Sequence, residues 1–216
     1  MYRLNSSIEQ RLASAQTIIE NSLNIPTILD TVTTYGYDEN KLRAAHNLYL
    51  TAAQQTRDQI REYGEKYAAT EKAQTSWQQA KATYTNTLKL ARLAFKDNTE
   101  ASNTLLLTGK REPSFAGWTH QVQTFYQNLL ANPAYLATMS RFNYDETKLK
   151  AEYTLVQNAI HTRQLQDQER AEAHLATQTR DTTLGQLDDW MQTYTTVLRI
   201  AFTQNPQWLE ALGISA

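Results

Sequence analysis

The four histidines are the first residues to test for chemistry, because histidine is the commonest metal ligand and general base. They are His46, His120, His161 and His174. A carboxylate-bridged di-iron bundle places a glutamate three residues before each ligating histidine. This sequence has Arg43, Gly117, Asn158 and Ala171 at those positions. No two histidines lie four residues apart, as a zinc-protease helix requires, so the spacing predicts no metal site.

Other patterns that support catalysis are also missing from the sequence. The chain has no cysteine, which excludes a thiolate nucleophile, a thiolate metal site and a disulfide framework. Its six glycines are too scattered for a phosphate-binding loop, and no Gly-x-Ser-x-Gly elbow occurs. We therefore predict no catalytic residues and no cofactor. A non-enzymatic protein is favoured, although an unfamiliar active site stays an alternative.

One polar group is a candidate for binding an anion or a small polar ligand. Antiparallel pairing of two long helices would bring Tyr63 and Tyr67 near Arg170 and His174, with Asp167 close by. We call this predicted group the waist. The alternative is a solvated row of hydrogen bonds with no ligand. Charged side chains are stable along a thinly covered seam, where water reaches them, but costly in a buried core.

The elements that must position these residues come from an internal duplication. Residues 8–107 align without a gap to residues 115–214, at a constant offset of 107. The segment Tyr37 to Leu42, for example, recurs as Tyr144 to Leu149, and Pro26 corresponds to Pro133. The sequence therefore predicts two helical repeats, 1–107 and 108–216, intertwined in one structural domain.

Helix starts can be read from capping residues. Ser7 followed by Gln10 resembles a capping box. It predicts a first helix over about 7–34, kinked or interrupted at Pro26. The corresponding helix should open at Ser114. Asp38 and Asp145 are suited to cap the helices that follow them.

Beyond Asp38 and Asp145 no clear stop appears until Asn98 and Asn205. We expect unbroken helices over 39–97 and 146–204, and hence an all-α, elongated antiparallel bundle of coiled-coil type with two pseudo-symmetric repeats. In the alternative, the pairs Ser76–Gln79 and Thr183–Gln186 begin separate helices. Hairpins near 70–76 and 177–183 would then give two three-helix bundles. Neither region contains the proline or paired glycines that helical hairpins commonly use.

The C-terminal segment begins with Pro206, which suits a first helical turn, and Gly213 suits a helix exit. We expect a short helix that docks Trp208, Leu209 and Leu212 on the core. The alternative is an exposed patch for a protein partner, because large apolar patches often mark interfaces.

This layout resembles uncharacterised bacterial all-helical proteins of similarly duplicated design. The resemblance includes a terminal Leu-Glu-x-Leu-Gly-Ile, which is matched here by the segment from Leu209 to Ile214. It spans most of the chain and implies no activity and no functional residues.

Composition limits the class of partner. A net charge of −1 without a basic block argues against nucleic-acid binding. No apolar stretch approaches the roughly 20 residues of a membrane-spanning helix, and the N-terminus lacks a signal-peptide pattern, so we expect a cytoplasmic protein. The leading hypothesis is a non-enzymatic interaction or scaffold protein with a rigid helical surface. The alternatives are a small-ligand-binding or enzymatic protein that uses the waist, and a self-assembling structural protein.

Overall fold

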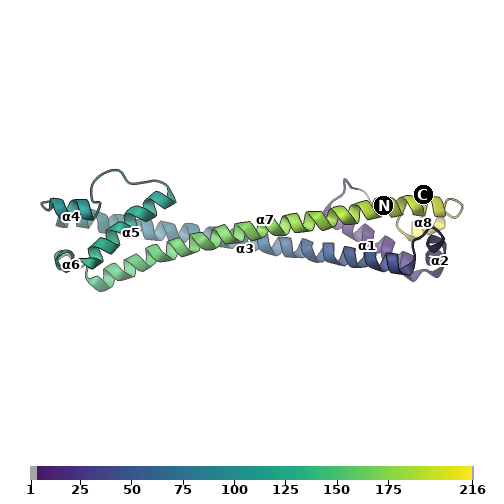
Figure 1. Cartoon of the computed structure of the whole chain (residues 1–216), viewed down its shortest axis with the longest axis horizontal. Helices are drawn as coiled ribbons and strands as arrows, with labels where there is room; N and C mark the ends of the chain where they lie inside the picture. The colour runs from purple at the N-terminus through teal and green to yellow at the C-terminus, as the bar shows by residue number, and fades with distance from the viewer. Residues whose placement is uncertain (1–3, 216) are drawn as a thin grey trace. The chain divides into compact units, whose positions relative to one another are not determined.

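A computed structural model describes residues 4–215, which form eight helices and no strand (Figure 1). The two longest helices carry most of the chain, and the others are short. In chain order the helices are α1 (Ile8–Asn24), α2 (Pro26–Thr34), α3 (Glu39–Ala94), α4 (Thr99–Thr104), α5 (Phe115–Ala131), α6 (Pro133–Ser140), α7 (Glu146–Ala201) and α8 (Gln207–Ala211). The all-α prediction is confirmed.

The predicted caps are present at the starts of the helices. The Gln10 backbone N–H donates to Ser7 Oγ, and the Ser7 backbone N–H donates to Gln10 Oε1, both at 3.3 Å, which completes the capping box. The Lys41 backbone N–H donates to Asp38 Oδ1 at 2.8 Å. The Lys148 backbone N–H donates to Asp145 Oδ1 at the same distance. These bonds satisfy amides that the first turn of a helix leaves without a backbone acceptor.

Pro26 divides the helix predicted over 7–34 into α1 and α2. Ile25 adopts an extended backbone conformation, with φ −101° and ψ 105°, and Pro26 occupies the first turn of α2. Asn132 and Pro133 separate α5 from α6 in the same way. Proline lacks the N–H that would continue the first helix, and a new first turn has no need of that donor.

Both long helices are continuous over 56 residues, so the hairpins near 70–76 and 177–183 do not form. Ser76 and Thr183 lie inside α3 and α7 and do not begin new helices. The helices end at Ala94 and Ala201, three residues before the predicted limits of 97 and 204. After α3, Asn98 caps the next helix, because its side chain accepts from the Ala101 backbone N–H at 2.9 Å.

The chain forms two compact units. The first contains the residues up to Gly64 together with those from Ala171 onward, and the second is Glu65–Arg170. The first unit therefore combines α1, α2 and α8 with parts of both long helices, and the second combines α4, α5 and α6 with the remaining parts. Each unit takes segments from both predicted repeats.

Each unit has its own hydrophobic core. In the first unit, α1 and α2 contribute Ile18, Ile28 and Val32, while Tyr194 and Phe202 come from the end of α7. In the second unit, buried residues of α5 such as Phe125 and Leu129 pack against buried residues of α3 and α7. No helix within residues 4–215 has an apolar stretch long enough to cross a membrane.

Within the second unit, α3 and α7 run antiparallel. Gln166 on α7 bonds to Thr70 on α3. Further along α3, Thr87 bonds to Glu152, which lies earlier on α7. As residue numbers increase along α3, the numbers of the bonded residues on α7 decrease. This pairing brings the two helices together along the segment where the candidate site lies.

Candidate functional site

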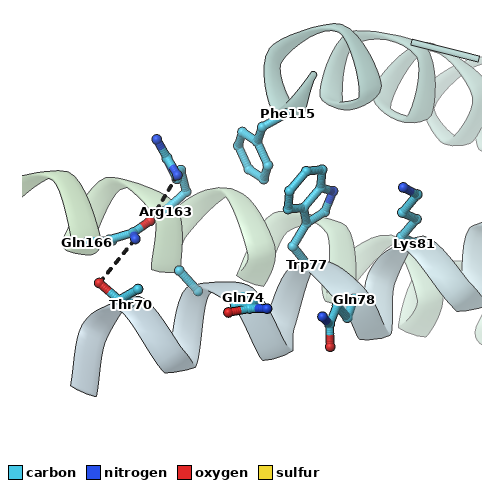
Figure 2. Close-up of a pocket in the computed structure, with 9 residues that line it drawn as sticks. Thr70, Gln74, Trp77, Gln78, Lys81, Phe115, Arg163 and Gln166 are labelled. Carbon is cyan, nitrogen blue, oxygen red and sulfur yellow. Dashed lines mark hydrogen bonds between the residues drawn. The ribbon is translucent and has the colours of Figure 1, made fainter. Parts of the chain in front are cut away.

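The candidate site is a cavity of about 390 Å³ in the second unit (Figure 2). It lies where α3 and α7 run together beside the start of α5. Most of its lining comes from α3, and one residue comes from α5. The lining residues are Thr70, Ala73, Gln74, Trp77, Gln78, Lys81, Phe115, Arg163 and Gln166.

Helical spacing places these side chains together. On α3, residues Thr70, Ala73, Trp77 and Lys81 follow one another at intervals of three or four, which puts them on one face. Phe115 is the first residue of α5, and its position depends on the Ser114 cap, whose Oγ accepts from the Gly117 backbone N–H at 3.2 Å.

Aromatic rings form the apolar part of the site. The centroids of Trp77 and Phe115 lie 5.3 Å apart, and their planes make an angle of 83°. Trp118, which is 3% exposed, supports them from α5, with its centroid 6.2 Å from that of Trp77. Edge-to-face contacts of this kind hold rings at a defined angle. The rings therefore give the cavity a shaped apolar wall.

Two cations lie close to this wall. The Arg163 guanidinium carbon is 5.9 Å from the Phe115 centroid, and Lys81 Nζ is 5.6 Å from the Trp77 centroid. Both distances are within the range of cation–π attraction. No carboxylate belongs to the lining residues, although Asp167, one turn along α7, lies 3.5 Å from Arg163. The cavity is therefore lined by aromatic, amide and cationic groups.

Hydrogen bonds orient the side chains at one end of the cavity. Gln166 Nε2 donates to Thr70 Oγ1 at 3.2 Å, and Arg163 Nη1 donates to Gln166 Oε1 at 3.0 Å (Figure 2). The Thr70 hydroxyl in turn donates to the Lys66 carbonyl oxygen at 2.8 Å. This chain of bonds links α3 to α7 and holds the guanidinium of Arg163 beside Phe115.

The indole nitrogen of Trp77 is buried, and residues 4–215 offer its N–H no acceptor. Figure 2 shows this nitrogen on the Lys81 side of the ring. A buried donor without an acceptor costs about 1–3 kcal/mol.

The first unit fills the corresponding positions differently. Asp188, 107 residues after Lys81, pairs with Arg11, 107 residues before Trp118, and their nearest atoms are 2.5 Å apart. Both of these side chains are mostly buried, at 15% and 12% exposed. Leu184 replaces Trp77, and Arg180 replaces Ala73. The second unit thus has an aromatic cavity where the first has an ion pair and a large cationic side chain.

The waist residues are divided between the two units. Tyr63 and His174 belong to the first unit, whereas Tyr67, Asp167 and Arg170 belong to the second. Tyr67 is 64% exposed, and Lys66 Nζ lies 4.8 Å from the centroid of its ring. The side chain of His174 contacts that of Gln178 on the same helix, with 3.2 Å between their nitrogen atoms. The waist stays a prediction, and one of its members, Asp167, lies 3.5 Å from Arg163 of the cavity.

The C-terminal residues lie in the core of the first unit. Leu209 is 5% exposed and Leu212 is fully buried, while Trp208 packs partly buried against the same core. Leu209 lies in α8 and Leu212 directly follows this helix, and both side chains are buried in the core. A partner patch at Trp208, Leu209 and Leu212 stays a prediction.

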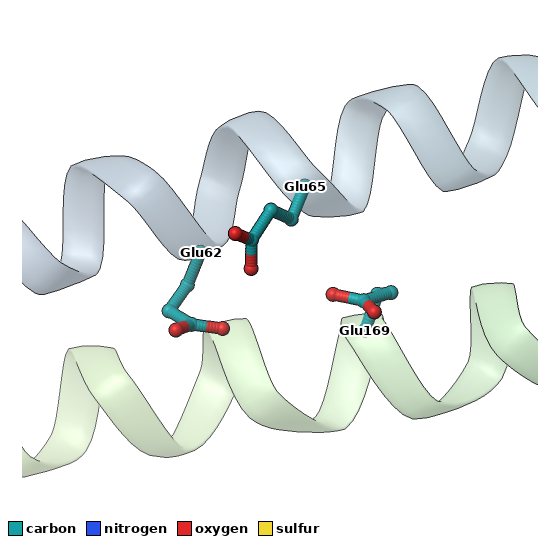
Figure 3. A group of neighbouring side chains, drawn as sticks. All are labelled: Glu62, Glu65 and Glu169. Atoms are coloured by element: carbon teal, nitrogen blue, oxygen red, sulfur yellow. The ribbon is translucent and has the colours of Figure 1, made fainter.

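Two carboxylates of the second unit lie close to each other. Glu65 on α3 and Glu169 on α7 belong to the second unit, and their carboxylate oxygens approach within 4.8 Å (Figure 3). Glu62, also drawn in Figure 3, belongs to the first unit. Two carboxylates alone do not define a cation site, because hard cations require six or more oxygen ligands.

The sequence analysis did not predict the cavity, because Trp77 and Lys81 belong to no recognisable metal, catalytic or ligand-binding motif. A usable signal was present in the offset of 107. At three cavity positions the second unit has Trp77, Phe115 and Lys81, where the first has a leucine, an isoleucine and an aspartate. Such differences mark the place where the two halves of the chain pack differently.

Comparison of the chain with models of known protein families, with curated proteins and with solved structures found no significant match.

Proposed function

We propose that this protein binds a small planar molecule in the cavity of the second unit and does not transform it. The observation that carries the proposal is the cavity of about 390 Å³ with Trp77 and Phe115 in its wall. Its volume lies within the range of small-ligand pockets, which are mostly apolar with a few polar groups that fix orientation. A planar molecule would cover the exposed parts of both rings.

The lining chemistry supports binding without catalysis. The side chains around the cavity comprise no histidine and no carboxylate that could act as a general base. The one hydroxyl group, that of Thr70, donates to a backbone carbonyl oxygen, which does not activate it as a nucleophile. The amides of Gln74, Gln78 and Gln166 can supply directional hydrogen bonds.

The proposal is tested by titrating the protein with planar indole, quinoline and naphthalene compounds. Binding is followed by the NMR signals of the four indole N–H groups, assigned with single Trp→Phe variants. We expect the signals of Trp77 and Trp118 to shift saturably, while those of Trp190 and Trp208 in the first unit stay in place. The proposal is wrong if no compound shifts the first pair, or if all four signals move alike.

A blocking variant makes this test sharper. Ala73→Arg introduces the residue found 107 positions later, and its side chain should fill the cavity and abolish binding. Gln79→Arg is the matched control, because it adds the same charge at an exposed position of α3. If Ala73→Arg does not fold, Trp77→Leu removes the ring instead and should weaken binding by about tenfold, as loss of a stacking contact does.

The scaffold hypothesis has weaker structural support. Ile60 on α3 and Leu175 and Ile200 on α7 are large apolar side chains of the first unit that are 60–63% exposed. Single exposed side chains of this kind are normal on monomeric proteins. A protein partner, or self-association through these residues, stays a prediction.

A further inference from the structure

We infer that the ligand of the cavity is an aromatic anion, a planar ring that carries a carboxylate or a similar acidic group. This inference rests on the proposed function and specifies its ligand class. The rings of Trp77 and Phe115 favour a planar ligand, and the cations of Lys81 and Arg163 favour a ligand with a negative charge. Figure 2 shows both cations beside the two rings.

The balance of charge at the cavity favours an anion. Lys81 and Arg163 are the charged members of the lining, and both are cationic. Lys81 Nζ lies 5.6 Å from the Trp77 centroid, and the Arg163 guanidinium carbon lies 5.9 Å from that of Phe115. A ring placed against either aromatic side chain would therefore hold its acidic group near a cation. Lys81 and Arg163 are themselves exposed, so water weakens this attraction without abolishing it.

The two cations should not contribute equally. Asp167 lies 3.5 Å from Arg163 and offsets part of its charge. Arg163 also donates to Gln166. Lys81 belongs to α3, and its Nζ lies 5.6 Å from the centroid of the Trp77 ring. We therefore expect Lys81 to contribute more to anion binding than Arg163 does.

In the first unit, the residues at the positions that correspond to Lys81 and Arg163 make contacts within the protein. There Asp188 stands in place of Lys81 and pairs with the mostly buried Arg11. Thr56 stands in place of Arg163, and its hydroxyl donates to the Ala52 carbonyl oxygen at 2.8 Å. At the same two positions the second unit has the cations Lys81 and Arg163, and the lining residues of the cavity include no carboxylate.

A neutral aromatic ligand is the competing class. The amides of Gln74, Gln78 and Gln166 could bond to a neutral carbonyl or amine as readily as to an acid. Only the response to charge separates the two classes. The experiment therefore needs two probes that share one shape and differ in charge.

Naphthalene-2-carboxylate and naphthalene-2-carboxamide form such a pair. Their dissociation constants are measured on the full chain at pH 7 and low salt, from the indole N–H shifts of Trp77 and Trp118. We expect the carboxylate to bind about fivefold more tightly, the factor that a partly exposed ion pair contributes. Salt should reduce this preference, because ions screen exposed charges.

Three variants locate the source of the preference. Lys81→Gln should remove most of it, and Arg163→Gln should remove less. Asp167→Asn should strengthen carboxylate binding, because it frees the charge of Arg163. Lys89→Gln is the control, since it removes the same charge from an exposed position of α3 outside the lining and should leave the preference unchanged.

The possible outcomes separate the two proposals. If neither probe shifts the signals of Trp77 and Trp118, the small-ligand function fails together with this inference. If both probes bind with equal affinity, the cavity is a ligand site but the inference of an anion is wrong. A carboxylate preference that persists in Lys81→Gln and Arg163→Gln together would also overturn it, because its source would lie elsewhere.

Discussion

The hydroxyl groups of Tyr126 and Tyr194 are buried in the two hydrophobic cores. Tyr126 in the second core donates to Glu152 Oε2 at 3.0 Å, and the Thr87 hydroxyl donates to the same oxygen at 2.6 Å. In the first core, Tyr194 donates to Ser22 Oγ at 2.7 Å. Each hydroxyl therefore has an acceptor inside a core from which water is excluded.

Burial raises the pKa of both tyrosines well above the ordinary value of about 10. For Tyr126 the nearby Glu152 carboxylate raises the pKa further, because a second negative charge beside it is unfavourable. In the unfolded chain both hydroxyls ionise near pH 10. Above that pH the unfolded state binds fewer protons than the folded state, so the free energy of unfolding decreases as pH rises.

We therefore predict alkaline destabilisation of about 1.4 kcal/mol per pH unit for each buried tyrosine above pH 10. The measurement is urea denaturation between pH 8 and about 11.5. Tyr126→Phe and Tyr194→Phe should each make the dependence on pH shallower. Val122→Ala is the control, because it should lower stability equally at every pH. A wild-type slope in both tyrosine variants would contradict the prediction.

At the scale of the element, the continuity of α3 and α7 is the main feature. Local sequence signals were ambiguous, because Ser76–Gln79 and Thr183–Gln186 both match a capping box. The segments before them contain no residue that breaks a helix. In the second unit, the α3 side chains on both sides of residue 75 contact α7 or α5, including Thr70, Ser76 and Trp77. These contacts favour the continuous helix over a turn.

A proline at Thr75 tests this continuity. Thr75 is an exposed residue inside α3, and Thr75→Pro should destabilise the protein by about 3 kcal/mol, because proline removes a backbone hydrogen bond and clashes with the preceding turn. Thr75→Ala, measured in parallel by urea denaturation, should be neutral or slightly stabilising. A hairpin turn near 70–76 would instead tolerate the proline, and equal stability of the two variants would show it.

At the scale of the whole molecule, the two units differ in how the chain builds them. The second unit is one continuous segment, Glu65–Arg170, whereas the first joins the two ends of the chain. The core of the first unit confirms this dependence, since Ile18 and Val32 from the N-terminal helices pack with Tyr194 and Leu212. The first unit is therefore incomplete without its C-terminal segment.

We predict that a fragment of residues 65–170 folds alone and that a fragment of residues 1–64 does not. The longer fragment retains the second core, including Phe125 and Leu149, whereas the shorter one lacks the residues of α7 and α8 that complete the first core. Circular dichroism should show a cooperative thermal transition for the first fragment only. A gradual, non-cooperative transition for residues 65–170 would show that the second unit depends on the first.

Much of the fold could be predicted from the sequence because its causes are local. Ser7, Asp38 and Asp145 cap helices through bonds to amides three residues away, and Pro26 interrupts a helix by its own covalent geometry. The offset of 107 is likewise a property of the chain, and helix starts recur at that offset, as in Glu39 and Glu146. The duplication itself stays an interpretation of this pattern.

The tertiary structure alone decided where the molecule is hollow. Trp77, Phe115 and Arg163 come from three different helices. Whether side chains fill the space between these helices depends on the volumes of all the side chains that face it. Helical spacing predicts which residues share a face, but it does not show whether the facing side chains occupy the space between them. Ala73 is a small residue in the cavity wall, whereas Arg180, at the corresponding position of the first unit, pairs with Asp181. The candidate site thus depends on packing between elements, which sequence periodicity does not specify.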